Sequence, residues 1–116
     1  MGTHKNLDVW KISVDFVVTI YKVTENFPVD EKFGLTSQMR RAAISIPSNI
    51  AEGAGRNSDK ENLYFLNIAL GSIAELDTQL IVANKLGYCK SSAEIELLST
   101  IKAKLINYIK YLKTLN

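Results

Sequence analysis

The chain of 116 residues has the length of one domain, predicted to span residues 1–116, and its 47% hydrophobic residues suffice for a core without metal or disulfide support. The net charge of +2 indicates no particular partner, and the single cysteine, Cys89, excludes an internal disulfide and favours a reducing, cytoplasmic setting. No apolar run approaches the roughly 20 residues of a membrane span, so we expect no membrane association.

The first helix is predicted from about Leu7 to about Phe27, because Pro28 disfavours helical backbone in the residue before it. Its expected core stripe recurs every three or four residues: Leu7, Trp10, Val14, Val17 and Tyr21. A charged connector from Pro28 to Gly34 follows.

The second helix is predicted from Thr36 or Ser37, whose hydroxyls suit a helix N-cap, to about Ala54. At about 100° per residue, one face is polar and the opposite face holds mostly small apolar residues. The apolar face consists of Met39, Ala42, Ala43, Ile46, Ile50, Gly53 and Ala54. We expect a neighbouring backbone to approach this face closely, and Pro47 to kink the helix.

Ser58 and Glu61 have the spacing of a capping box, which predicts a third helix reaching about Leu86 with Gly87 as its stop. Ser91 and Glu94 repeat that spacing and predict the start of a fourth helix. The core stripe of the fourth helix is Leu98, Ile101, Leu105, Tyr108, Leu112 and Leu115. Because no segment shows sustained strand alternation, we predict an all-α fold, an antiparallel up-down-up-down four-helix bundle.

The third helix is apolar on more sides than a monomeric bundle needs. Its main stripe is Leu66, Ala69, Ile73, Leu76, Leu80 and Ala83. Further apolar residues lie outside it: Leu63, Phe65, Ile68, Leu70, Ala74, Ile81, Val82 and Leu86. This surplus predicts a homo-oligomer whose subunit interface covers it, and the alternative is a wide core stripe in an unusually apolar monomer.

The residue types needed for common catalytic and metal sites are scarce. The only histidine is His4, which argues against Ser-His-Asp and Cys-His catalysis and against the Glu-x-x-His pair of di-iron bundles. There is no zinc-type cluster of cysteine and histidine. We therefore predict that the chain is not an enzyme, with no catalytic residue, no metal ligand and no cofactor.

Four residues of the second and third helices are predicted to form a structural polar network: Asn49, Glu52, Glu75 and Gln79. Glu52 also stands four residues before Arg56, the favourable order for an ion pair on a helix. Buried carboxylates need such partners, so we prefer a structural role to a catalytic one.

Basic residues occur in two places that could contact nucleic acid. Arg40, Arg41 and Arg56 belong to the second helix and its end, and residues 102–116 carry four lysines and no acid, Lys102, Lys104, Lys110 and Lys113. The lysines could equally complement the dipole of a helix C-terminus. Among the aromatic residues near them, only Tyr111 is expected to be free for stacking.

Three stretches carry a family resemblance: LDVWKISVDFVVTIYKVTENFP, QMRRAAISIPSNIAEGAGR and FLNIALGSIAELDTQL. They resemble the bacterial four-helix bundle proteins encoded in 23S rRNA intervening sequences, and the resemblance covers nearly the whole chain. It implies a four-helix bundle assembled as a homopentamer. The fold is also similar to the accessory variability determinant of diversity-generating retroelements, whose strongly basic pentamer binds nucleic acid and a reverse transcriptase.

Two functional hypotheses follow. In the first, an oligomer binds RNA or DNA non-specifically through phosphate contacts, and the resemblance implies Arg40, Arg41 and Arg56 as contacts, with Lys102, Lys110 and Lys113 extending the patch. In the second, the chain is a protein-interaction scaffold that docks a partner such as a reverse transcriptase or a ribosomal protein. The pI near 8.7 is less basic than the resemblance to the retroelement protein implies.

Overall fold

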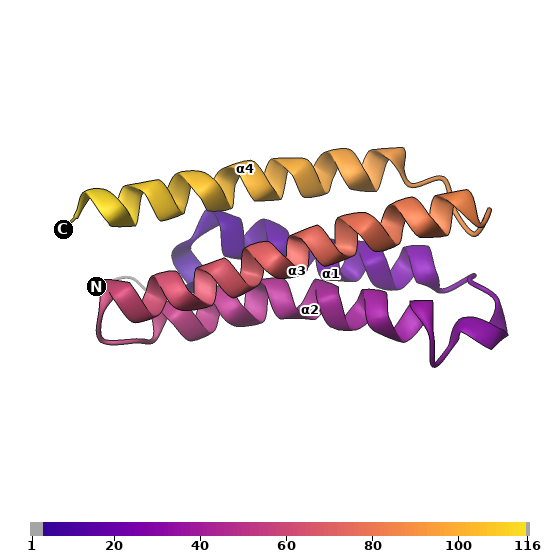
Figure 1. The fold of residues 1–116 in the computed structure, drawn as a ribbon, viewed down its shortest axis with the longest axis horizontal. Helices are drawn as coiled ribbons and strands as arrows, with labels where there is room; N and C mark the ends of the chain where they lie inside the picture. The colour runs from indigo at the N-terminus through magenta and orange to yellow at the C-terminus, as the bar shows by residue number, and fades with distance from the viewer. Residues whose placement is uncertain (1–3, 116) are drawn as a thin grey trace.

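Four helices make up the bundle in the computed structural model, which describes residues 4–115: α1 (Asp8–Thr24), α2 (Leu35–Ala54), α3 (Asp59–Lys85) and α4 (Ser92–Thr114). Two short 3₁₀ turns, η1 (His4–Asn6) and η2 (Val29–Glu31), precede α1 and connect it to α2. Successive helices run in opposite directions (Figure 1). Residues 4–115 contain no strand, which confirms the predicted all-α up-down-up-down bundle.

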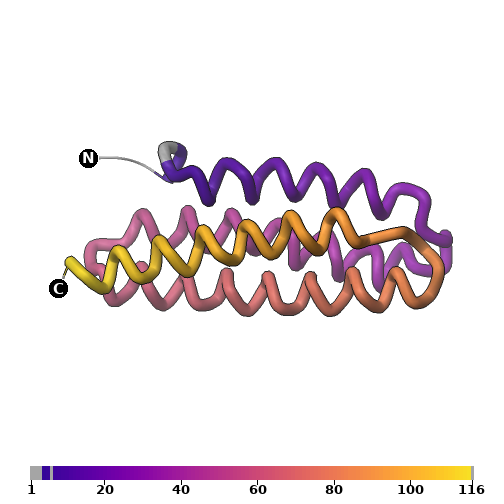
Figure 2. Tube along the Cα trace, turned by 90° about the horizontal axis from the view of Figure 1, so that it is seen from above, coloured from indigo at the N-terminus to yellow at the C-terminus, as the bar shows by residue number. Residues whose placement is uncertain are grey.

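The bundle is elongated, with extents of 47 × 23 × 20 Å. The α1–α2 and α3–α4 connections lie together at one end, and the α2–α3 connection lies at the other (Figure 1, Figure 2). A site built from the α1–α2 connection is therefore located at an end of the rod, beside the connection that precedes α4.

The buried face of α1 differs from the predicted one. The side chains of Val9, Phe16 and Ile20 are buried, whereas Tyr21 of the expected stripe is 39% exposed. Two small polar residues complete the buried face, because Ser13 and Thr24 donate their hydroxyls to carbonyls one turn earlier, at 2.8 Å in both cases. The periodicity of apolar residues alone does not identify a buried face that includes hydroxyl groups bonded to the backbone of their own helix.

The small-residue face of α2 is buried as predicted and packs closely on α3. A Cβ added at Gly53 would lie 2.5 Å from Asn62 Oδ1 and 2.9 Å from the Asn62 carbonyl oxygen. Gly53 is thus the point where the backbones of α2 and α3 leave no room for a side chain. Elsewhere in α2, Pro47 is buried, and the helix continues through it.

The helix starts agree with the predictions for α3 and α4 but not for α2, and only α3 has the expected side-chain cap. Ser58 Oγ accepts a 3.2 Å hydrogen bond from the Glu61 amide, as expected of a capping box. At the start of α2 the cap is Glu31, whose Oε1 accepts from the Leu35 amide at 3.1 Å, so neither Thr36 nor Ser37 serves. Ser91 is the N-cap residue of α4, as predicted, but its buried hydroxyl makes no capping bond and donates to the Leu80 carbonyl at 3.0 Å.

Gly87 ends α3 as predicted. Its φ of 80° lies in the left-handed region, which glycine adopts without strain. The Tyr88 amide donates to the Ala83 carbonyl at 3.0 Å, and the Gly87 amide donates to the Asn84 backbone carbonyl at 2.9 Å. These two bonds form a Schellman motif, which satisfies the last carbonyls of α3 and reverses the chain toward α4.

The main stripe of α3 is buried, but part of its apolar surplus is exposed. Ile68, Ile81, Val82 and Leu86 are 37%, 41%, 41% and 54% exposed. Within residues 4–115, α3 is the one helix long and apolar enough to cross a membrane, a test that the core helix of a soluble protein also passes. On α4, Ile109 is buried although it lies outside the predicted core stripe, and Leu115, the last residue of that stripe, is exposed.

Candidate nucleic-acid interface

An open groove of about 480 Å³ lies where the end of α1, the α1–α2 connector and the first half of α2 meet. Its lining consists of Tyr21, Lys32, Phe33, Thr36, Ser37, Arg40, Arg41 and Ile44. Three of these residues are cations and none is an acid, so the groove has a local positive charge that the net charge of the chain does not reveal. We refer to it as the basic groove.

Arg40 forms a fixed wall of the basic groove. Its Nε donates to Thr24 Oγ1 at 2.8 Å, and its Nη2 donates to the Tyr21 carbonyl at 3.3 Å. The guanidinium carbon also lies 4.4 Å from the centroid of the Tyr21 ring. These contacts attach α2 to the C-terminal turn of α1, where the helix dipole favours a cation.

Arg41, the next residue of α2, is exposed and lines the same groove. Across from α2, the connector contributes Lys32 and Phe33, and the Lys32 ammonium lies 5.5 Å from the centroid of the Phe33 ring. The Phe33 side chain is 88% exposed. The groove therefore interleaves exposed cations with aromatic rings, the combination found in single-strand binding proteins.

The connector that carries Lys32 and Phe33 is anchored by the carboxylate of Glu31. One oxygen accepts from the Leu35 amide at 3.1 Å and the other accepts from the Tyr88 hydroxyl at 2.8 Å. The Leu35 bond, followed by the Tyr88 bond, lowers the pKa of Glu31, and the same bond to Glu31 raises the pKa of Tyr88. The carboxylate is thus ionised at neutral pH, and each of its oxygens accepts one of these two hydrogen bonds.

Arg56 lies far from the other two predicted arginines, just beyond the opposite end of α2. It forms the predicted ion pair with Glu52, and its guanidinium carbon lies 4.7 Å from the centroid of the Phe65 ring. The structure therefore brings Arg40 and Arg41 together and leaves Arg56 at the α2–α3 end of the bundle.

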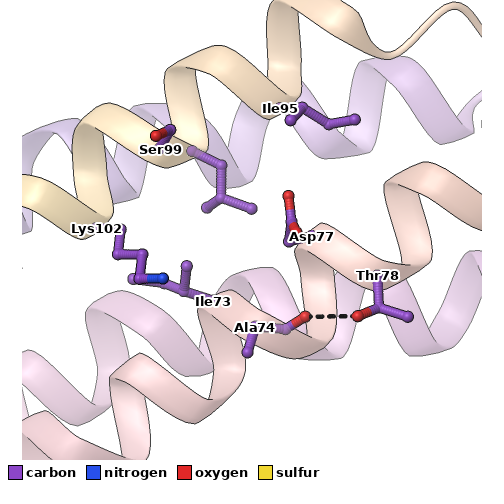
Figure 3. Close-up of a pocket in the computed structure, with 8 residues that line it drawn as sticks. Ile73, Ala74, Asp77, Thr78, Ile95, Ser99 and Lys102 are labelled. Carbon is purple, nitrogen blue, oxygen red and sulfur yellow. Dashed lines mark hydrogen bonds between the residues drawn. The ribbon is translucent and has the colours of Figure 1, made fainter.

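The predicted lysines Lys102, Lys110 and Lys113 are exposed along α4. Lys102 lines a second groove, of about 330 Å³, between α3 and α4. Figure 3 shows Ala74, Asp77 and Thr78 of α3 on one side and Ile95, Ser99 and Lys102 of α4 on the other. Since Asp77 would repel a phosphate there, this groove suits an anionic ligand less well than the basic groove does.

The four residues of the expected polar network do not join into one network. Gln79 Nε2 donates to Glu75 Oε2 at 3.3 Å within α3, and Glu52 pairs with Arg56. Asn49 instead donates to the carbonyl and the hydroxyl of Ser45, at 2.8 and 2.9 Å.

Two serines that the sequence reasoning overlooked make the link between the helices. The hydroxyls of Ser45 on α2 and Ser72 on α3 lie 2.8 Å apart in a hydrogen bond. Ser72 is buried, and its place among apolar neighbours of the third helix was the available signal. Within residues 4–115, both hydroxyls bind polar groups of α2 and α3, so we interpret the bond as a structural link between these helices.

Sequence reasoning also missed Tyr21, Lys32 and Phe33 as parts of a site. For Lys32 and Phe33 the available signal was their adjacency in the connector, where neither side chain has a predicted core position. Among residues 4–115, no cluster of three or more histidine, cysteine, aspartate or glutamate side chains is placed to hold a metal ion.

Comparison with protein-family models matches residues 5–110 to the family described as 23S rRNA-intervening sequence protein. The matched region includes all eight residues that line the basic groove. No curated protein matches the chain.

Proposed function

The chain belongs to the 23S rRNA-intervening sequence protein family, and from this premise we propose that it is a non-enzymatic, homo-oligomeric helical bundle that binds RNA or DNA at the basic groove. The observation that carries the proposal is the convergence of Lys32, Arg40 and Arg41 on one groove with no acid in its lining. The family description, which refers to a ribosomal RNA, is consistent with a nucleic-acid ligand.

The three cations have different roles in this proposal. Arg41 and Lys32 are exposed and contact the phosphates directly, and the forked donors of an arginine suit phosphate oxygens. Arg40 already donates to Thr24 and to Tyr21, so it contributes positive charge and holds α1 and α2 in the geometry that shapes the groove. Such contacts are non-specific in sequence and weaken with salt.

Oligomerisation is supported by the apolar residues that α3 leaves exposed. Ile68, Ile81, Val82 and Leu86 are each more than a third exposed in the single chain. A second copy of the chain would remove this surface from water, and the family resemblance implies a pentamer. Repetition of the groove around an oligomer would let several weak phosphate contacts act on one strand.

The alternative, a scaffold that docks a protein partner, is favoured by the same exposed residues of α3. Light scattering separates the two cases. An oligomer uses this surface for its own assembly, whereas a monomer leaves it available for a different protein.

The test of nucleic-acid binding is fluorescence anisotropy with labelled RNA and DNA over a salt series. We expect affinity to fall steeply with salt, and Arg41→Ala and Lys32→Ala each to reduce the slope by about 0.7 for a single strand. Arg56→Ala, which removes a distant arginine, is the matched control and leaves the slope unchanged. Arg40→Ala is less suitable, because it also removes the bonds to α1.

Absence of binding by the wild-type protein at about 50 mM salt, where phosphate contacts are strong, would overturn the nucleic-acid proposal. If Arg56→Ala and Arg41→Ala reduced the salt slope equally, the basic groove would not be the contact surface.

A further inference from the structure

Phe33 is the most exposed aromatic ring of the basic groove. Its side chain is 88% exposed, although burial of a phenyl ring is favourable in water. The backbone around it is fixed, because Glu31 binds the Leu35 amide on one side of the connector and the Tyr88 hydroxyl on the other. Phe33 is therefore a large apolar surface held in solvent beside cations.

The second aromatic ring of the groove is already occupied. Tyr21 is 39% exposed, and the guanidinium of Arg40 lies over its ring at 4.4 Å from the centroid. The contact of Lys32 with Phe33 is looser, at 5.5 Å, and leaves most of the phenyl ring in water. Phe33 is thus the ring of the groove that is open to a planar ligand.

We infer that the basic groove selects single-stranded over double-stranded nucleic acid, by stacking one unpaired base on Phe33 while Arg41 and Lys32 bind the flanking phosphates. This inference rests on the proposed function and adds the class of nucleic acid. In a duplex each base is stacked on its neighbours, so its face cannot reach Phe33. In a single strand an unstacked base is available, and every base has a π-face, which makes the contact tolerant of sequence.

The charge of the groove favours a nucleic acid over a protein as the occupant. An apolar peptide segment would use Phe33 and Ile44 but would desolvate Lys32 and Arg41 and supply no anionic partner for them. A polyanion with planar bases satisfies the cations and the ring together.

The experiment compares Phe33→Ala with the wild type in anisotropy titrations of single-stranded RNA, single-stranded DNA and a duplex of each. The strands are about 12 nucleotides long, within the site sizes of small single-strand binders. Val29→Ala is the matched control, because Val29 is 86% exposed in the same connector but is not aromatic. Phe33→Trp keeps a stacking surface, and circular dichroism verifies that each variant is folded.

We expect the wild type to bind single strands more tightly than duplexes, and Phe33→Ala to weaken single-strand binding by about 5- to 150-fold, the loss of one stacked base. Its salt slope stays unchanged, because Phe33 neutralises no phosphate. Duplex binding stays within about twofold, Val29→Ala behaves as the wild type, and Phe33→Trp retains the affinity. Parallel losses for RNA and DNA are expected, since a ring stacks on either.

Two results would overturn the inference while leaving the proposed function standing. One is salt-dependent binding of single strands and duplexes with equal affinity, and the other is an unchanged single-strand affinity of Phe33→Ala. A protein that binds neither form at low salt would overturn the proposed function itself. If Tyr111→Ala weakened single-strand binding and Phe33→Ala did not, the stacking contact would lie on α4 and the inference about Phe33 would be overturned.

Discussion

The Tyr88 hydroxyl donates a 2.8 Å hydrogen bond to Glu31 Oε2 and thereby joins the α3–α4 connection to the α1–α2 connection. The Tyr88 ring also lies against Phe27, with the ring centroids 5.4 Å apart. Since Glu31 caps α2 with its other oxygen, one carboxylate fixes both the start of α2 and the segment that presents Lys32 and Phe33.

Replacement of Glu31 by glutamine is expected to destabilise the protein at neutral pH and to have less effect in acid. The pKa of Glu31 is lowered in the folded chain, so its stabilisation is complete above the ordinary pKa of 4.5 and is lost as the pH falls through the lower folded value. Thermal unfolding at about pH 7 and about pH 3 should show a melting-temperature difference between Glu31→Gln and wild type that shrinks in acid.

Tyr88→Phe is the companion variant for that experiment, because it removes one of the two bonds of Glu31 and keeps the cap of α2. At neutral pH, Tyr88→Phe should lower the melting temperature by less than Glu31→Gln does. The raised pKa of Tyr88 means that its contribution is present below the ordinary value of 10.0 and is lost as the pH rises through the folded value. If the melting-temperature difference between Glu31→Gln and the wild type were the same at both pH values, the role assigned to the carboxylate would be contradicted.

Gly53→Ala is expected to destabilise the bundle by about 1–3 kcal/mol, the usual range for overpacking. The added Cβ meets the Asn62 side chain and carbonyl oxygen at 2.5 and 2.9 Å, and the carbonyl belongs to the α3 backbone and cannot rotate away. Urea unfolding measures the loss.

Gly71→Ala is the matched control for Gly53→Ala, since it makes the same change in α3, where an added Cβ meets nothing within 4 Å. It should stabilise the protein by about 0.4–1 kcal/mol through helix propensity and the unfolded state. Equal effects of the two variants would show that α2 and α3 separate easily at Gly53.

Val82→Lys is expected to lower the molar mass measured by light scattering, because Val82 is part of the exposed apolar surface assigned to subunit contacts. It is 41% exposed in the single chain, so a lysine there leaves the fold of one bundle intact. Val18→Lys makes the same replacement on α1 at a residue that is 50% exposed and should leave the mass unchanged. A wild-type protein that is monomeric at micromolar concentration would contradict the assignment.

Sequence periodicity predicted the helices and the buried faces of α2 and α3, because these faces consist of apolar residues at helical spacing. It misplaced the buried face of α1, where Ser13 and Thr24 are buried with their hydroxyls bonded to the helix backbone. It placed Ser91 correctly at the N-cap of α4, but the Ser91 hydroxyl donates to Leu80 on the preceding helix and makes no capping bond. Local spacing does not determine which partner a hydroxyl meets once the helices pack.

The candidate site was predictable only in part, for the same reason. Arg40 and Arg41 were identified from the sequence, but their grouping with Lys32 and Phe33 depends on how the connector folds back over α2. One of the bonds that hold this connector joins Glu31 to Tyr88, and no local pattern encodes it. Arg56 lies just beyond the far end of α2, a helix of 20 residues, and so is separated from Arg40 and Arg41.

The Glu31–Tyr88 bond joins residues that are 57 positions apart in the chain. Of the two bonds that the Glu31 carboxylate accepts, only the one to the Leu35 amide is local in the sequence. A chain that ends before Tyr88 would therefore keep the bond at the start of α2 and lose the bond to the turn that leads into α4.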